Sequence, residues 1–335
     1  MNKKQIIGLI VAASVFTLVC ISSVLTNSYS KSINKDEKNT LSSFETMLSD
    51  SSISLPIEDF VGVVNVEGTI QDSSGSSSIF SSEQSYNHKN TLDYIENMKN
   101  ATNNKGILLY VNSPGGGVYE SDELYLKLKE YKEETGRPVW TYMSTEACSG
   151  GYYISMASDK IYANRNTWTG SIGVIMSLTN YKELYDKIGI KETHITSGPN
   201  KAIGAGGIDM TDEQKQILQG LVDEAYEQFA GIVADGRHMD IETVKPIADG
   251  RIYSAKQALD LGLIDEIDSY ENMVSDMENL VGDDITFYTP KGMPDIFSSL
   301  FSISKEFRSK SDAQVVTEYL EKKGTGGLMY YAKPE

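Results

Sequence analysis

The strongest constraint on the fold is an alternation of apolar strand-like runs with helical patterns between residues 61 and 163. The runs VGVVNV at 61–66 and GILLYV at 106–111 are almost wholly apolar, as is typical of strands covered on both faces. The segments 91–100 and 119–134 instead carry helical patterns. Because strands that alternate with helices form parallel sheets through right-handed crossovers, the sequence predicts an α/β fold with a mostly parallel sheet and crossover helices.

The second half of the chain is more helical. A long helix is predicted from Thr211 to residue 237, because Thr211 and Gln214 have the spacing of a capping box. Its apolar stripe predicts core or subunit interface rather than a ligand site. The stripe contains Ile217, Leu218, Leu221, Val222, Ala225 and Phe229.

Composition excludes several classes of function. The formal net charge is −17, and sequence-independent nucleic-acid binding needs clustered basic residues, so we expect no nucleic-acid partner. The only cysteines, Cys20 and Cys148, are not expected to form a disulfide. No Cys/His cluster has the spacing of a zinc site, so we expect neither a metal nor another cofactor.

The N-terminus carries a targeting signal. MNKK precedes an uncharged run from Ile6 to Leu25 that is long enough to span a bilayer as a helix. The lysines predict a single-pass cell-membrane protein with a cytoplasmic N-terminus and an extracytoplasmic remainder. A cleaved signal peptide is the alternative, and a lipoprotein modified at Cys20 is a weaker one, because Val19 is large for the preceding position.

Four regions follow from these patterns. Residues 1–26 are the predicted cytoplasmic tip and transmembrane anchor, and the polar residues 27–56 are a tether. Residues 57–290 form the folded domain, with a flexible SSGSSS segment at 73–78. Residues 291–335 are a C-terminal extension with weaker patterning and a flexible tail.

Two glycine-rich turns, NSPGGGVYES at 112–121 and ACSGGYY at 147–153, each follow a strand and precede a helix. Ligands of open parallel sheets bind at that edge. Gly115–Gly117 form either a plain tight turn or a backbone donor for an oxyanion. Ser149 is either a helix N-cap or a nucleophile, with the Gly150 amide beside it. Cys148 is the competing nucleophile, but we expect its side chain to lie in the core.

A serine nucleophile needs a base. Nothing in the surroundings of His88, His194 or His238 favours a catalytic histidine; His194 is placed in a predicted strand. A lysine can serve if its environment lowers its pKa from about 10.4. Lys201, in TSGPNKAIGAGG at 196–207, is the best such candidate, because small and apolar residues follow it and no carboxylate is near in sequence.

Several motifs in order, NSPGGGVYES, SGGYYIS, TGSIGV and SGPNK, together resemble the membrane-anchored signal peptide peptidase (SppA) family, serine proteases of the ClpP/crotonase superfamily. The segment 249–267 resembles the superfamily's closing helix–strand motif. The resemblance covers about residues 60 to 270 and also the N-terminal anchor. It implies a ClpP/crotonase-like fold in a ring- or dome-shaped homo-oligomer.

The same resemblance implies a Ser-Lys dyad. Ser149 matches the family's nucleophile, Lys201 its general base, and Ser171 the hydroxyl that helps to hold the lysine amine. Gly150 and the turn at Gly115 and Gly116 match the oxyanion hole. The dyad can be shared between neighbouring subunits, and the implied substrates are hydrophobic peptides, such as signal peptides left in the membrane after secretion.

Two other classes stay open from sequence. A crotonase-like acyl-CoA enzyme would share the fold and the oxyanion turn without needing the Ser-Lys pair. A non-catalytic membrane scaffold would use Ser149 only as a helix cap. The tail GGLMYYAKPE at 326–335 could also reach the peptide groove as a substrate mimic and be trimmed by the enzyme itself.

Overall fold

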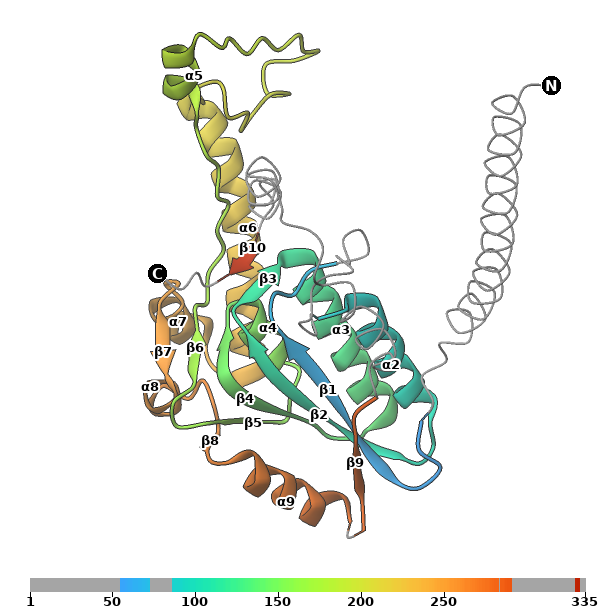
Figure 1. Cartoon of the computed structure of the whole chain (residues 1–335). Coiled ribbons are helices and arrows are strands. Elements are labelled where there is room, and N and C mark those ends of the chain that lie inside the picture. Colours follow the sequence, from blue (N-terminus) through green and yellow to red (C-terminus); the bar gives the residue numbers. More distant parts are fainter. Residues whose placement is uncertain (1–54, 73–85, 283, 291–328, 332–335) are drawn as a thin grey trace, which may run out of the picture. The chain divides into compact units, whose positions relative to one another are not determined.

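The computed structural model describes residues 55–72, 86–282, 284–290 and 329–331 (Figure 1). The predicted anchor at 1–26, the tether up to residue 54, the SSGSSS segment and the extension apart from residues 329–331 lie outside the described residues. Within the described ranges, no helix is both long and apolar enough to cross a membrane.

One sheet forms the centre of the described domain. Its strands are β1 (Phe60–Glu67), β2 (Asn104–Ser113), β4 (Val139–Cys148), β5 (Lys160–Ala163), β6 (Trp168–Gly170), β7 (Ile252–Ser254), β8 (Glu266–Ile267) and β9 (Thr286–Tyr288). The order is β7-β6-β4-β2-β1-β9, and β5 pairs with β4 and β8. Neighbouring strands are parallel except for the antiparallel β6–β7 pair. The predicted mostly parallel sheet is therefore confirmed.

Helices cover both faces of this sheet. Helices α2 (His88–Asn100) and α3 (Val118–Thr135) lie together on one side, and α9 (Tyr270–Val281) packs on the other (Figure 1). Val61 and Val63 join the buried cluster of α9, while the intervening Gly62 faces Met98 of α2. Burial on both sides explains why β1 and β2 read as continuous apolar runs in the sequence.

Helix boundaries follow local capping chemistry. Helix α2 begins three residues before the predicted start because the Asn87 side chain accepts a hydrogen bond from the Asn90 amide at 2.9 Å. Helix α6 (Asp212–Arg237) begins with the predicted capping box, in which Thr211 and Gln214 each bond the other's backbone amide.

The apolar stripe of α6 divides into two parts. Its C-terminal half is core, because Ala225 and Phe229 are buried there. Its N-terminal half is exposed: Ile217 and Leu221 are 42% and 45% accessible. The N-terminal half therefore does not pack into the core of its own chain. Of the two predicted roles of the stripe, core and subunit interface, the core role applies only to the C-terminal half.

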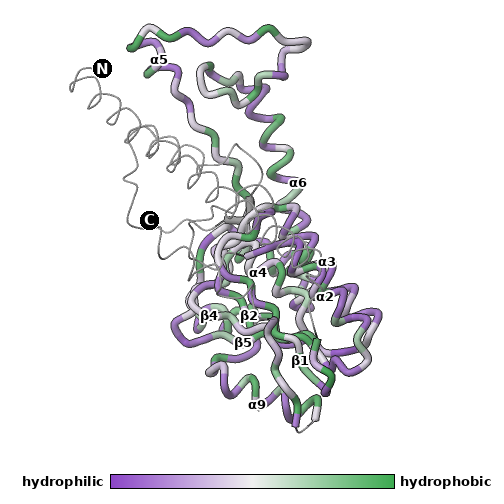
Figure 2. Tube along the Cα trace, turned by 45° about the vertical axis from the view of Figure 1, so that its right-hand side comes forward, coloured by the Kyte–Doolittle hydropathy of each residue, from purple (hydrophilic) through white to green (hydrophobic). Residues whose placement is uncertain are grey.

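Residues 174–221, which we call the arm, extend beyond the sheet. They carry the short helix α5 (Lys182–Ile188) and return through the N-terminal half of α6 (Figure 1). Figure 2 shows hydrophobic stretches along this part of the chain. Apolar side chains exposed here are Ile175, Leu178, Leu184, Ile188, Ile190, Ile195, Ile217 and Leu221.

The remaining elements close the domain. Helix α7 (Ile241–Val244) and a 3-10 turn (Lys245–Ile247) lead into β7, helix α8 (Ala255–Asp260) and β8. The closing helix–strand segment expected at 249–267 is thus present. Two short strands, β3 (Gly115–Gly117) and β10 (Met329–Tyr331), pair antiparallel in a separate sheet.

Candidate active site

Ser149 occupies a strained strand-to-helix turn. It follows the last residue of β4 and precedes helix α4 (Gly150–Ser155), with φ 54° and ψ −117°. A residue with a Cβ rarely adopts such angles, and they persist only where surrounding contacts hold them. One such contact is the Ser149 amide, which donates to the Gly170 carbonyl at 2.8 Å. The sharp turn predicted at this serine is observed.

The Ser149 hydroxyl is not a helix cap. It is buried, at 1% exposure for the residue, and its Oγ has no hydrogen-bond partner among the described residues. At the N-cap positions of α2, α6, α8 and α9, by contrast, the capping side chain accepts an amide hydrogen bond. A buried, unpartnered hydroxyl is costly unless another group uses it, which favours a chemical role over capping.

The Gly115–Gly117 turn meets the start of α4 directly after Ser149. A Cβ on Gly150 would lie 3.1 Å from the Gly116 amide nitrogen, so glycine is required for the two turns to meet. The Gly115 carbonyl and the Gly117 amide both bond Ile70, at 2.9 and 2.8 Å. Because strand backbone groups alternate in direction, the Gly116 amide faces the other edge of β3. The structure thus brings Gly115, Gly116 and Gly150 together at the start of α4, where the helix dipole favours negative charge.

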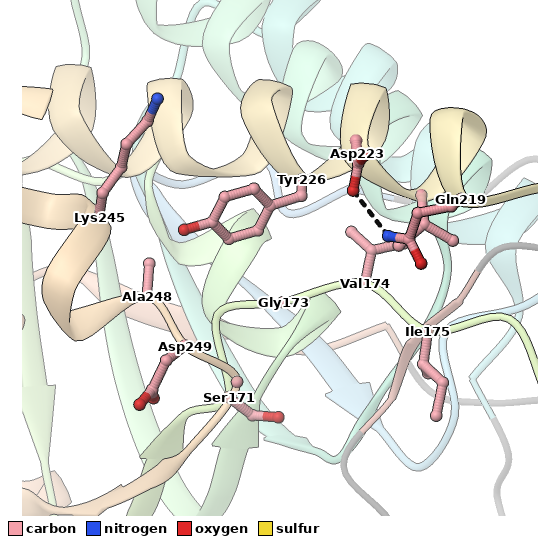
Figure 3. A pocket seen from close by; sticks show the side chains of 12 residues that line it. Ser171, Gly173, Val174, Ile175, Gln219, Asp223, Tyr226, Lys245, Ala248 and Asp249 are labelled. Carbon is pink, nitrogen blue, oxygen red and sulfur yellow. Dashed lines mark hydrogen bonds between the residues drawn. The ribbon is translucent and has the colours of Figure 1, made fainter. Parts of the chain in front are cut away.

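Ser171 lies beside Ser149, at the end of the neighbouring strand. Cys148 of β4 pairs with Gly170 of β6, and Ser171 follows directly with φ 49°. Ser171 lines a pocket of about 520 Å³ between the start of the arm, α6 and the turn before β7 (Figure 3). The pocket also contains Asp223, Tyr226 and Lys245.

Lys201 is remote from these residues within the same chain. It is exposed, in a turn whose Pro199 carbonyl accepts a hydrogen bond from Gln214 near the start of α6. Helix α6 reaches the candidate site at Gln228, which donates to the Tyr153 hydroxyl of α4 at 2.8 Å. The stretch of α6 between Gln214 and Gln228 is about 20 Å long, far more than the reach of a lysine side chain.

The competing groups have other roles. His88 lies between Tyr86 and Glu123 in a buried network, and His194 contacts Glu192 in an irregular segment instead of the predicted strand. His238 ends α6 in a left-handed conformation.

Cys148 is buried, as predicted. Burial, with a smaller contribution from nearby Glu146, raises the pKa of its thiol to about 12, so the reactive thiolate is not populated at neutral pH. In the described part of the chain, no cluster of His, Cys, Asp or Glu could hold a metal ion.

The C-terminal strand β10 lies at the same site. Met329–Tyr331 pairs antiparallel with Gly115–Gly117, on the opposite edge from Ile70. The edge of β3 opposite Ile70 therefore accepts an extended segment beside the candidate oxyanion amides. Sequence patterning alone did not indicate a strand in either segment.

Two protein families match parts of this chain. Residues 76–170 match the Clp protease family, and residues 131–283 match peptidase family S49. The predicted resemblance to the SppA-type serine peptidases is therefore confirmed, and the mixed α/β fold with a mostly parallel sheet is consistent with a Clp-like fold.

Individual relatives give the same result. A candidate signal peptide peptidase SppA of Enterococcus faecium is 42% identical over 215 residues, which are 64% of this chain and 62% of that protein. Protease 4 of Haemophilus influenzae is 30% identical over 70% of this chain and 37% of its own length. The chloroplastic serine protease SPPA of Arabidopsis thaliana is 32% identical over 52% of this chain and 26% of its own length. The chain thus covers less than two thirds of each of these relatives.

Proposed function

We propose that this chain is a membrane-anchored serine endopeptidase in which Ser149 attacks the peptide carbonyl. The observation that carries this proposal is the buried, unpartnered Ser149 hydroxyl, held at a strained turn directly before Gly150, where the Gly115–Gly116 turn meets α4. The matches to peptidase family S49 and to proteins named as serine proteases support it. The proposed mechanism needs no cofactor or metal.

In the proposed mechanism, the neutral amine of Lys201 takes the proton of the Ser149 hydroxyl as Oγ bonds to the substrate carbonyl carbon. The carbonyl oxygen becomes an oxyanion, which the amides of Gly150 and of the Gly115–Gly116 turn stabilise. Lys201 then protonates the leaving amine as the peptide bond breaks. Lys201, neutral again, then takes a proton from water as the water oxygen attacks the acyl-enzyme, and it returns that proton to Ser149 Oγ as the ester bond breaks. Ser171 helps to hold the Lys201 amine throughout.

The lysine in this mechanism comes from a neighbouring subunit of a homo-oligomer. Within one chain, Lys201 is exposed and far from Ser149, so a dyad inside one subunit would require the arm to refold. Ser171 lines a pocket that a group from a second chain can enter. The exposed apolar side chains of the arm would be buried by such an assembly, which is the usual reason for a patch of this kind.

Extended peptides are the proposed substrates. An extended substrate can add by backbone hydrogen bonds to the edge of β3 that β10 takes in this structure, next to the proposed oxyanion amides. The relatives named as signal peptide peptidases support remnant signal peptides as the natural class. A membrane anchor at Ile6–Leu25, with the catalytic domain extracytoplasmic, would hold the enzyme near such substrates.

The pairing of β10 with β3 leads to a prediction about self-processing. The tail occupies the proposed substrate edge, so the active enzyme is expected to shorten its own C-terminus. Intact-mass measurement should then find purified Ser149→Ala protein heavier than wild type prepared in parallel. A variant that is lighter than wild type, by only the oxygen atom that the substitution removes, would contradict self-processing.

The function itself can be tested with a serine-directed fluorophosphonate probe. The proposal expects covalent labelling at Ser149, faster as pH rises, and greatly slowed labelling in Lys201→Ala, because the base is missing. Absence of labelling at Ser149 in the wild-type oligomer would favour a non-catalytic scaffold. Cleavage of an acyl-CoA, but of no peptide, would favour the crotonase-like alternative.

A further inference from the structure

A second buried hydroxyl near the candidate site has no partner. Ser121, in the first turns of α3, is 0% exposed, and Ser121 Oγ and Ser149 Oγ are the buried side-chain polar atoms of the described residues that lack a hydrogen bond. A helix serine normally satisfies its hydroxyl on the carbonyl four residues earlier. Ser155 of α4 does so, donating to the Gly151 carbonyl at 2.8 Å, and Thr135 of α3 donates to Tyr131 at 2.7 Å. Ser121 does not form this hydrogen bond to the carbonyl four residues earlier.

The Ser121 hydroxyl points instead to Gly150. The position where a Cβ on Gly150 would lie is 2.4 Å from Ser121 Oγ and 3.1 Å from the Gly116 amide nitrogen. The hydroxyl and this amide therefore flank the same side of Gly150. Two donors that share one oxygen acceptor, each at about 2.9 Å, lie less than about 6 Å apart. The two distances from the Gly150 Cβ position keep Ser121 Oγ and the Gly116 nitrogen within that limit.

We propose that the Ser121 hydroxyl is a third hydrogen-bond donor of the oxyanion site, beside the amides of Gly116 and Gly150. The inference rests on the proposed serine-peptidase function. A hydroxyl offers one O–H donor that rotates to suit its acceptor. In the resting chain that donor has no described partner, so no existing bond has to break when negative charge develops nearby.

The chemical step involves no proton transfer from Ser121. As the bond between Ser149 Oγ and the carbonyl carbon forms, the carbonyl π electrons move to the oxygen. The Ser121 O–H then donates a hydrogen bond to that oxygen, and the bond weakens again when the carbonyl re-forms and the amine leaves. The hydroxyl thus acts in the transition state more than in the substrate complex, which places its effect on kcat rather than on KM.

Ser121→Ala tests this role in the full-length oligomer. With a fluorogenic peptide, we expect kcat to fall about 10²-fold with KM unchanged, the effect typical of one lost oxyanion donor. A peptide boronic acid, which mimics the tetrahedral oxyanion, should bind more weakly by a factor similar to the loss in kcat/KM. The denaturation midpoint should not fall, because the substitution removes a hydroxyl that has no partner to leave behind.

Ser155→Ala is the matched control, since it removes an equally buried helix hydroxyl that is already satisfied. It should keep wild-type kcat and boronate affinity. Full kcat in Ser121→Ala, or a loss of kcat accompanied by a lower midpoint than that of Ser155→Ala, would overturn the donor role. Ser149→Ala measured alongside separates a failure of the Ser121 proposal from a failure of the proposed peptidase function. If Ser149→Ala is inactive while Ser121→Ala is fully active, only the role of Ser121 is wrong. An active Ser149→Ala would contradict the peptidase function itself.

Discussion

Ser149→Ala is expected to lower kcat/KM for a peptide substrate by about 10⁴-fold or more, the scale of losing a catalytic nucleophile. The oxyanion amides and the peptide-binding edge would remain, so peptide should still bind to the variant. The measurement is steady-state hydrolysis of a fluorogenic peptide by the purified oligomer, with sedimentation velocity to show that assembly is unchanged.

Ser149→Gly is the control that separates chemistry from folding. It should be equally inactive but more stable than Ser149→Ala by about 1 kcal/mol, because glycine adopts the positive φ without the strain that a Cβ imposes. Chemical denaturation of both variants checks this order. If either variant retains wild-type turnover, Ser149 is not the nucleophile.

Most of the fold could be predicted because its signals are local. The apolar runs of β1, β2 and β4 and the capping box at Thr211 each produce a pattern within a few residues. Strand-to-helix order then predicts a parallel sheet and places the turns at Gly115 and Ser149 on one edge. The structure agrees on all of these points.

The pairings that could not be predicted depend on contacts distant in sequence. Gly115–Gly117 read as a turn, yet these residues pair with Ile70 on one edge and with Met329–Tyr331 on the other. Three glycines carry no strand propensity, so tertiary contacts alone make them a strand. The exposure of Ile217 and Leu221 could not be predicted either, because a periodic apolar stripe has the same sequence pattern whether it packs on the core or on another molecule.

The candidate site was predictable in part. Ser149 and Ser171 come together because β4 and β6 are neighbours, and the glycines at 115 and 116 join them because they follow β2, the other neighbour of β4. Ser121 was missed, since a serine at the fourth position of a helix normally bonds its own backbone. No pattern in the sequence indicates its role, because its contact with Gly150 exists only once α3 packs against α4.

The separation of Lys201 from Ser149 within one chain leads to the second large effect. Ser149→Ala and Lys201→Ala oligomers should each be inactive alone. If the two subunit types are dissociated, mixed in equal amounts and reassembled, a subunit with intact Ser149 can stand beside one with intact Lys201. For random assembly, about a quarter of the sites would then carry both groups, and activity should return to about that fraction of wild type.

This mixing experiment is the most direct test of the dyad between subunits. Recovery of activity in the reassembled mixture, but not in either variant carried through the same treatment, is the predicted result. A mixture that co-assembles, as shown by differently tagged subunits, and yet stays inactive would contradict the proposal, because it would mean that Ser149 and its base must belong to the same chain.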